Sequence, residues 1–313
     1  MNEVLLKYHN LNVTFEMYGL RIRALREINF EVNRGEVLGI VGESGSGKSV
    51  LLQATLRLLP KNAKVDGDIY YKGLNLLSID ERKFRNILGK NFSLIPQGFA
   101  SLNPCISNWI QISERPMEHF GILKNNGQKL AIDLLDKLGI NNPIKVAKGY
   151  RSQLSGGMLQ RVLVAMGISA PSEIIFVDEP TKGLDGKTKK LVTNLLKISK
   201  EMTKSMVIVS HDLSFLREIA DRICVLYWGD VLELCSSKVF FESPRHPYSQ
   251  ALLNSLPSRG LIPIQGEPPS INSLPAGCNF HPRCPHSNSK CKQLRPKLIP
   301  VDDGMVRCLL YGE

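Results

Sequence analysis

Eight consecutive residues constrain this chain more than any other feature: Gly42-Glu43-Ser44-Gly45-Ser46-Gly47-Lys48-Ser49. The apolar run 37–41 before them predicts a buried strand, and residues 50–59 after them predict a helix that is stopped by Pro60. A glycine loop between a strand and a helix start places backbone N–H groups and the helix dipole around a polyphosphate. The pattern therefore predicts a nucleoside triphosphate site, in which Lys48 reaches the β- and γ-phosphates and the Ser49 hydroxyl binds Mg²⁺.

The composition is that of an ordinary globular protein. Its 313 residues are 43% hydrophobic and 22% charged, enough for one large core with a small appendage or for two modest domains. The N-terminus has no signal-peptide pattern, and no stretch approaches the roughly 18 uncharged apolar residues of a membrane span. We therefore expect a soluble, cytosolic protein.

The formal net charge of +11 limits the choice of partners. It is compatible with nucleic acid, with an anionic membrane surface, or with a triphosphate and an acidic partner. The sequence has no arginine-rich helix and no interleaving of aromatic and basic residues that would stack bases. Proximity to a membrane is the better explanation of this charge.

The order of patterns along the chain indicates an α/β fold. Residues 3–33 alternate loosely and predict antiparallel strands, whereas residues 80–170 are richer in helical patterns, including one at 128–138. The apolar runs 173–178 and 206–210 predict buried parallel strands, with a helix at 188–202 between them, as in a doubly wound core. Near residue 257 the composition changes to frequent Pro, Gly and Cys, so we expect a compact, loop-rich tail after that point.

Asp178 and Glu179 close the second buried strand. An aspartate at this position is expected beside the phosphate loop, where it can hold Mg²⁺ through water. The adjacent Glu179 can polarise the water that attacks the γ-phosphate. The pair therefore predicts hydrolysis of the bound triphosphate.

A second anion-binding helix start follows from the segment Leu154-Ser155-Gly156-Gly157-Met158-Leu159-Gln160-Arg161. Ser155 and the two glycines open a helical pattern that runs to residue 169. It lies roughly 110 residues beyond the phosphate loop. Two helix termini that each face a triphosphate, this far apart in one chain, pose a geometric problem for a single nucleotide.

With these motifs in their order and spacing, residues 1 to about 257 resemble the ABC ATPases. The resemblance includes Gln97, Asp185 and His211, which follow the same order as in that family. It implies a P-loop NTPase core with an antiparallel β subdomain, a helical signature subdomain at about 80–170, and a nucleotide-binding domain that extends to 257. A small, Cys-rich, loop-dominated module at 258–313 would follow it.

By this resemblance, two subunits pack head to tail around ATP. The phosphate loop of one faces Ser155, Gly156 and Gly157 of the other, and Asp185 crosses the interface. Gln97 would sense Mg²⁺ and the water and couple to a membrane subunit, while His211 would contact the γ-phosphate and hold Glu179 and the water. Phe15 or Tyr18 would stack on adenine, and the residues neither decide between them nor exclude a core role for Phe15. The partner would be a second ABC ATPase in a heterodimer, which rests on the resemblance alone.

The tail extends the resemblance to nearly the whole chain. The runs 244–253, 266–269 and 277–285 are similar to the C-terminal extension of ATPases that serve oligopeptide and dipeptide importers and the related nickel importers. This implies an ATP-hydrolysing importer subunit on the cytoplasmic face of the cell membrane. Its partners would be two membrane-spanning permease subunits and, indirectly, an extracytoplasmic solute-binding protein. The residues do not separate peptides from nickel or a metal chelate.

Four cysteines lie in the tail: Cys278, Cys284, Cys291 and Cys308. Their separations by five, six and sixteen residues match neither zinc-ribbon nor ferredoxin spacing. Four thiolates gathered by loops can hold a [4Fe–4S] cluster or a zinc ion, and some members of the importer subgroup carry the cluster. Unmetallated thiols remain open as well, and His281 or His286 could replace a ligand. A metal here would be structural, because a module this poor in apolar residues needs a staple.

Two functions of other classes remain to be weighed. A soluble ABC ATPase acting on nucleic acid or ribosomes is disfavoured, because the sequence has no coiled-coil insertion, no second cassette and no nucleic-acid stripe. A metal-cluster redox protein with a vestigial ATP site is disfavoured because the hydrolytic residues are intact.

Overall fold

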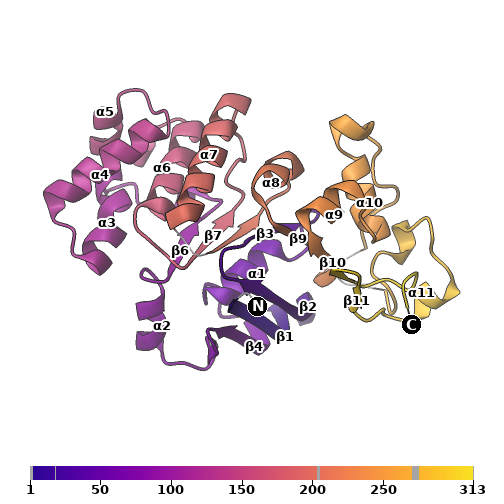
Figure 1. The fold of residues 1–313 in the computed structure, drawn as a ribbon. Helices are drawn as coiled ribbons and strands as arrows, with labels where there is room; N and C mark the ends of the chain where they lie inside the picture. Colours follow the sequence, from indigo (N-terminus) through magenta and orange to yellow (C-terminus); the bar gives the residue numbers. More distant parts are fainter. Residues whose placement is uncertain (1–2, 18, 203–204, 270–274, 313) are drawn as a thin grey trace. The chain divides into compact units, whose positions relative to one another are not determined.

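The computed structural model describes residues 3–17, 19–202, 205–269 and 275–312, and these residues form two compact units (Figure 1). The first unit contains the residues up to Asn33, Leu38–Ser78 and the residues from Ala220 onward. The second contains Arg34–Val37 and Ile79–Ile219. The phosphate loop and the tail therefore belong to one unit, and Glu179, His211 and Ser155 belong to the other.

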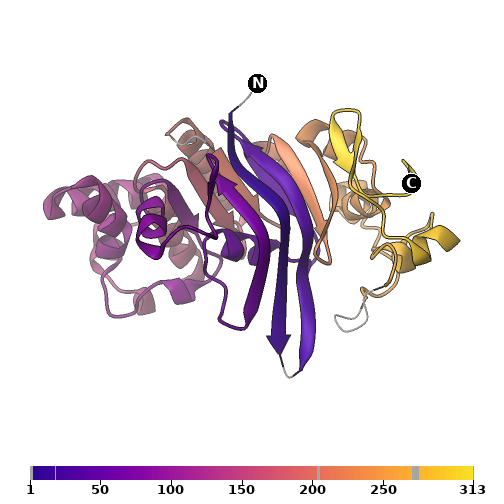
Figure 2. The ribbon, with the colours of Figure 1, turned by 90° about the horizontal axis from the view of Figure 1, so that it is seen from below.

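Long antiparallel strands dominate the beginning of the first unit (Figure 2). The strand order is β2-β1-β4-β5, and the strands are β1 (Val4–Met17), β2 (Leu20–Asn33), β4 (Ala63–Tyr71) and β5 (Leu74–Asn75). Alternate side chains such as Leu11, Val13 and Ile28 are buried, because successive residues of a strand face opposite sides of a sheet. The predicted antiparallel strands at 3–33 are confirmed.

A mixed sheet in the same unit includes part of the tail. Strand β3 (Val37–Val41) lies parallel to β9 (Arg222–Tyr227), and β10 (Asp230–Ser236) lies antiparallel to β9. Strand β12 (Gly304–Val306) pairs with β10, and β11 (Ile299–Val301) pairs with β12. The tail therefore continues the sheet of the preceding segment, and the boundary near residue 257 stays a prediction.

The helices of the first unit are short. They are α1 (Lys48–Thr55), α9 (Ser237–Glu242), α10 (Pro247–Asn254) and α11 (Ser289–Gln293), with single 3₁₀ turns at Pro257–Arg259 and His281–Arg283. The predicted helix after the loop is confirmed in type, but it begins at Lys48, two residues before the predicted start, and the prediction that it continues to Pro60 is wrong. It ends at Thr55 because Arg57 adopts a left-handed backbone, φ 52°. The N–H groups of Arg57 and Leu58 then bond back to the carbonyls of Ala54 and Gln53, which closes the helix.

The second unit combines parallel strands with a group of helices (Figure 1). The strand order is β6-β7-β8, from β6 (Phe92–Ile95), β7 (Ile174–Asp178) and β8 (Ser205–Val209). The α-helices are α2 (Glu81–Ile87), α3 (Asn108–Phe120), α4 (Lys124–Lys137), α5 (Pro143–Lys148), α6 (Gly156–Ile168), α7 (Gly186–Met202) and α8 (Leu213–Ile219). Single 3₁₀ turns lie at Phe99–Ser101 and Arg151–Gln153.

Continuous apolar runs place the strands of this second unit in its core. Ile174, Phe176 and Val207 are fully buried, as expected for parallel strands that are covered on both faces. Helices α3, α4 and α5 pack together, and α6 packs on α3 and α4. The predicted strands and the helices at 128–138 and 188–202 are confirmed in type, with shifted ends. None of the helices in the described part of the chain has the length and apolar character needed to cross a membrane.

Candidate functional site

The phosphate loop has a backbone that only glycine can adopt at its first position. Gly42 has φ +154°, and a Cβ built there would overlap the carbonyl oxygen of Leu226. Gly47, at φ +104°, forms the N-cap of α1, and its Cβ would lie 2.6 Å from the carbonyl oxygen of Ala24. These close approaches explain the glycines by packing, beyond their conformational freedom. The loop is therefore held in one shape by the strand residues around it.

Lys48 lies folded over the loop. Its Nζ donates to the carbonyl oxygens of Gly42 and Glu43, at 2.8 Å and 2.9 Å, and contacts the Ser46 hydroxyl at 3.4 Å. The side chain is buried, so its charge depends on these oxygens for solvation. The ammonium thus lies at the mouth of the loop, where a phosphate can accept hydrogen bonds from it. Ser49 is half-buried in the first turn of α1.

Two further groups fasten the loop to later parts of the chain. The N–H of Gly229 donates to the carbonyl oxygen of Ser46 at 3.0 Å. The N–H of Glu43 donates to the hydroxyl of Tyr248 at 2.8 Å. The sequence had not singled out either contact, because each joins residues about 180 to 205 positions apart.

In the second unit, the buried carboxylate of Glu179 is paired with the largely exposed side chain of His211. His211 Nδ1 lies 2.7 Å from Glu179 Oε2, and the His211 N–H donates to Oε1 at 3.1 Å. The Ser210 hydroxyl adds a contact to Oε2 at 3.4 Å. Glu179 is only 6% exposed, whereas 63% of the His211 side chain is exposed. A carboxylate held this way has one fixed orientation. The histidine ring that contacts it is exposed at the surface.

The backbone of Glu179 is itself constrained. Its φ is +51°, a left-handed conformation that a glutamate rarely adopts, and its N–H donates to the carbonyl oxygen of Val209 at 2.9 Å. Strained backbone of this kind is typical of functional positions. The preceding residue, Asp178, ends β7 and is half-buried. Gln97 is also half-buried and follows β6, so both residues lie at the carboxyl ends of parallel strands in this unit.

The serine and glycines of the signature segment form the start of α6. Ser155 is the N-cap, and its hydroxyl accepts a hydrogen bond from the N–H of Met158 at 3.4 Å. A Cβ at Gly156 or Gly157 would meet only side-chain atoms of Phe99 or Leu184, at 3.9 Å. The helix terminus is therefore open, and its N–H groups and positive dipole suit an anion.

Asp185 opens the next helix in the same way. Its carboxylate accepts hydrogen bonds from the Thr188 N–H at 3.0 Å and from the Thr188 hydroxyl at 2.8 Å. These hydrogen bonds lower the pKa of Asp185, so the group is a carboxylate at neutral pH. The structure thus shows Asp185 as a cap of α7, and its contact with a second subunit stays a prediction.

Of the two aromatic residues predicted to stack on adenine, the structure describes Phe15. Phe15 lies on β1, opposite Ile22 and Ala63, and is half-buried. Tyr18 falls outside the described residues. Phe15 is therefore not a core residue of the described structure, and the choice between the two aromatic rings stays a prediction.

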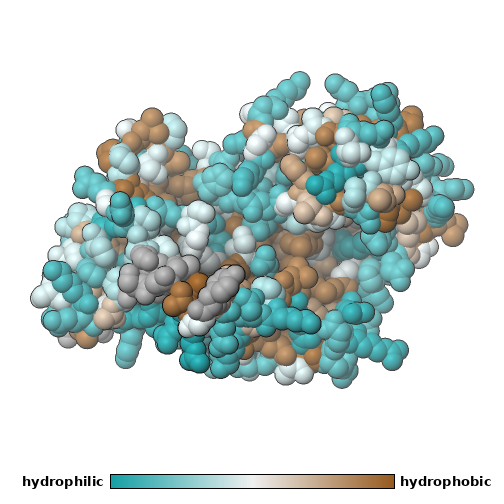
Figure 3. Space-filling model, turned by 180° about the vertical axis from the view of Figure 1, so that it is seen from behind, coloured by the Kyte–Doolittle hydropathy of each residue, from teal (hydrophilic) through white to brown (hydrophobic). Residues whose placement is uncertain are grey.

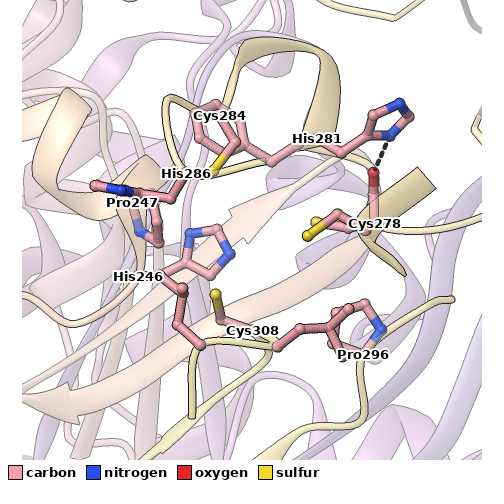
Figure 4. Close-up of a pocket in the computed structure, with 12 residues that line it drawn as sticks. His246, Pro247, Cys278, His281, Cys284, His286, Pro296 and Cys308 are labelled. Carbon is pink, nitrogen blue, oxygen red and sulfur yellow. Dashed lines mark hydrogen bonds between the residues drawn. The ribbon is translucent and has the colours of Figure 1, made fainter. Parts of the chain in front are cut away.

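The four tail cysteines line one small pocket (Figure 4). The sulfur atoms of Cys278, Cys284 and Cys308 point into the same space beside the imidazole of His246, and Cys291 also lines the pocket. Burial raises the pKa of Cys278 to about 12, and it also raises the pKa of Cys284 and of Cys308. These thiols are thus protonated at neutral pH, and a metal would displace their protons.

The chemistry of this pocket suits the predicted metal, but its size does not. Four thiols suit a [4Fe–4S] cluster or zinc by chemistry. However, no group of three His, Cys, Asp or Glu side chains in the described part of the chain comes together as a metal site. The cavity is only ≈ 20 Å³, room for about one water molecule, so a cluster does not fit unless the loops move. His281 is no ligand here, because its Nδ1 contacts the carbonyl oxygen of Cys278 at 2.9 Å and its ring points away from the sulfurs (Figure 4).

Together, the glycine loop before α1, the ordered Glu179–His211 pair and the open start of α6 define an ATP-binding cassette. The fold agrees with solved cassettes. The chain is similar to the structures titled "Dimeric structure of a post-hydrolysis state of the ATP-binding cassette MJ0796 bound to ADP and Pi" and "Dimeric Structure of MJ0796, a Bacterial ABC Transporter Cassette". Both have a TM-score of 0.68, with 28% and 27% identity, and both cover 74% of this chain and 99% of the other.

Sequence comparison agrees with this fold. The profile of the ABC transporter family matches residues 25–182, and that of the oligopeptide/dipeptide transporter C-terminal region matches residues 232–291. The dipeptide transport ATP-binding protein DppD of Bacillus subtilis is 36% identical and covers 99% of this chain and 96% of its own length. DppD of Escherichia coli is 37% identical over 96% and 94%, and the oligopeptide transport ATP-binding protein OppD of B. subtilis is 35% identical over 96% and 86%. This chain belongs to the ABC transporter family, and its cassette is an ATPase.

Proposed function

We propose that this chain is the ATP-hydrolysing subunit of an ABC importer for dipeptides and oligopeptides. The observation that carries the proposal is the presence, in one chain, of a cassette match at residues 25–182 and an oligopeptide/dipeptide C-terminal match at residues 232–291. The relatives compared above are named for dipeptide or oligopeptide transport. Neither the nickel alternative nor a cassette acting on nucleic acid gains support from them.

In this proposal Glu179 is the general base. Its carboxylate accepts the proton of the attacking water, and the hydrogen bonds from His211 and Ser210 keep it pointed in one direction. His211 Nδ1 faces Glu179, which leaves the Nε2 side of the ring to face the γ-phosphate; the protonated ring would donate a hydrogen bond to each. The oxygens of Ser49, Gln97 and Asp178 suit Mg²⁺, which would neutralise charge on the phosphates.

The start of α6 is proposed to serve the nucleotide of a partner subunit. Its open N–H groups at Gly156 and Gly157, together with the Ser155 hydroxyl, form an anion site at a helix terminus. Asp185 would contact that partner. The dimeric cassette structures that this chain resembles support a two-subunit arrangement. A heterodimer with a second ABC ATPase is proposed from the family resemblance.

Two membrane-spanning permease subunits are the proposed membrane partners, reached from the cytoplasmic face. The second unit exposes apolar side chains that a docking surface can use, among them Ile106, Phe120, Leu123, Ile144 and Tyr150. Leu123 is 73% exposed. On the face drawn in Figure 3, apolar residues lie in groups among hydrophilic ones. The solute-binding protein would act on the far side of the membrane.

For the tail cysteines we propose a site for a soft metal, as a [4Fe–4S] cluster or, alternatively, zinc. The gathering of four thiols in one pocket supports this. The loops would have to open, because the pocket is too small for a cluster in the described conformation. Iron, sulfide and zinc content of protein purified without oxygen tests the proposal. A metal-free protein, or a content unchanged in Cys284→Ser, would remove it.

Uptake by intact cells tests the transport function. A strain that lacks this subunit should lose uptake of a labelled dipeptide or oligopeptide, and the native chain should restore it. The Glu179→Gln variant should not restore uptake, because the water would have no base. Uptake of labelled nickel, followed in the same strains, should stay unchanged. Loss of nickel uptake with intact peptide uptake would assign the chain to the other substrate.

A further inference from the structure

One residue of the phosphate loop, Glu43, is held on its side chain by Arg283 of the tail and on its backbone by Tyr248 of α10. Arg283 binds the carboxylate through two hydrogen bonds, from Nη1 to Oε2 at 2.6 Å and from Nη2 to Oε1 at 3.0 Å. Tyr248 accepts the N–H of the same residue. A two-pronged pair of this kind fixes geometry as well as charge, so both contacts set the position of Glu43.

Arg283 is built into the fold. Only 4% of its side chain is exposed, against 31% for Glu43. Its Nε donates to the carbonyl oxygen of Gln265 at 3.1 Å, and its Nη1 also donates to the Tyr227 hydroxyl at 3.3 Å. Burial works against the charged form, but the hydrogen bonds to Glu43 and Tyr227 outweigh it and raise the pKa of Arg283. The guanidinium is thus a fixed cation inside the first unit.

Three packed aromatic side chains adjoin this contact, and two of them bind its residues: Tyr227 contacts Arg283, and Tyr248 contacts Glu43. The rings of Tyr227 and Tyr248 lie 4.5 Å apart, and Phe280 lies 5.4 Å and 5.2 Å from them. The three side chains come from β9, α10 and the tail, and all are fully buried. Packed aromatic rings move little, so these three side chains hold the tail and the phosphate loop in fixed positions within the first unit.

Glu43 also binds Lys48, the lysine of the phosphate loop. The carbonyl oxygen of Glu43 accepts a hydrogen bond from Lys48 Nζ at 2.9 Å. If Glu43 shifts, the lysine loses a partner that holds it at the mouth of the loop. Glu179 and His211 are not among these contacts. Release of Glu43 should therefore weaken nucleotide binding more than it slows the hydrolytic step.

We propose that Arg283 is a positioning residue for the phosphate loop: by holding Glu43, it sets the affinity of the loop for a nucleoside triphosphate. The inference rests on the proposed function, since it requires that the loop binds ATP.

The test compares full-length variants for ATP binding and hydrolysis. Arg283→Met should raise the Kd and the KM for ATP about tenfold, within the usual range of coupling between sites, and change kcat by a much smaller factor. Arg283→Lys should restore part of the affinity, because it keeps the charge without the two-pronged fork. Arg245→Met is the matched control, because Arg245 is another largely buried arginine of the first unit, paired with Asp302 and Asp303 of the tail. Its Kd should equal that of the native chain.

A double variant shows whether Arg283 acts through Glu43. The losses in Glu43→Gln and Arg283→Met should not add when the two are combined, since both break one contact. Melting temperatures identify any variant that unfolds, and Glu43→Gln then carries the test alone by the same rise in Kd. An unchanged Kd in a folded Arg283→Met or Glu43→Gln variant would overturn the inference, as would additive losses. Absence of ATP binding by the native chain would instead remove the proposed function.

Discussion

Glu179 Oε2 and His211 Nδ1 lie 2.7 Å apart, and the His211 N–H holds the other carboxylate oxygen at 3.1 Å. One residue thus fixes the carboxylate from its ring and from its backbone. The ring is mostly exposed and the carboxylate is not, so a nucleotide that touches the ring can act on a buried base. The contact joins a glutamate with a left-handed backbone to the histidine that follows β8 in the second unit.

The first prediction concerns this base. Glu179→Gln should lower kcat for ATP hydrolysis by about 10²–10⁴-fold, the usual contribution of a general base. ATP binding should persist, because the phosphate loop is untouched. Glu218→Gln is the control, because that exposed carboxylate pairs only weakly with Lys197, at 3.5 Å. Unchanged hydrolysis in Glu179→Gln would remove Glu179 from the assigned role.

The second prediction concerns the first glycine of the loop. Gly42→Ala should cost about 1–3 kcal/mol of the free energy of unfolding and abolish measurable ATP binding, because its Cβ would overlap the carbonyl oxygen of Leu226. Gly35→Ala has a similarly left-handed backbone, φ +84°, with open space around it. It should cost about 1–2 kcal/mol and leave the Kd for ATP unchanged. Equal Kd values for the two variants would contradict the steric explanation.

The third prediction concerns the buried cap of α10. His246 Nδ1 accepts the Tyr248 N–H at 3.0 Å, and burial lowers the pKa of His246 to about 3, so the ring is neutral. His246→Ala should lose about 2–4 kcal/mol, from the cap and from the cavity it leaves. His246→Asn keeps a cap acceptor and should lose less. Chemical unfolding of the two variants measures the difference, and a smaller loss in His246→Ala would rule out the cap.

The fourth prediction is a pH dependence at the start of α8. Burial opposes the Asp212 carboxylate, but the Lys189 ammonium at 2.7 Å and the Phe215 N–H outweigh it and lower the pKa of Asp212. A lowered folded pKa gives stability that is complete above the unfolded value near 3.9 and is lost as pH falls through the folded value. Lys189→Met should therefore cost about 1 kcal/mol at pH 7 and progressively less below about pH 4.

The control for this pH dependence is Lys197→Met, which breaks the exposed pair with Glu218. It should change the free energy of unfolding by at most a few tenths of a kcal/mol at either pH. Urea unfolding at several pH values measures both variants. A Lys189→Met deficit that stays constant into acid would show that the lysine acts by packing alone.

The sequence predicted those features whose causes are local. The helix at 128–138 ends where Gly139 adopts φ +66°. A glycine at this point of the sequence predicts the end of a helix, because glycine adopts a left-handed backbone easily. Helix α1 ends by the same hydrogen-bond pattern at Arg57, but arginine carries no such signal, so the end was placed at Pro60. Strands β3, β7 and β8 were found because buried parallel strands are continuous apolar runs.

Contacts between distant residues could not be read from the sequence. Arg283 and Glu43 are 240 residues apart, and neither residue type demands the other. The role of Glu179 was inferred from its place after a buried strand, and its pairing with His211 followed from the resemblance, whereas the geometry of the pair needed the structure. The tail cysteines were recognised by number, but their spacing gave no pocket size, so the cluster was predicted without knowledge of the small cavity.

The pairing of β12 with β10 has a consequence for any shortened form of the chain. A protein cut at about residue 257 would keep β10 but lose the strand that covers its outer side. Its backbone N–H and C=O groups near Glu233 and Leu234 would then be open to pairing with other molecules. Such a fragment should self-associate through this strand, so the tail protects the cassette from aggregation whether or not it ever carries a metal.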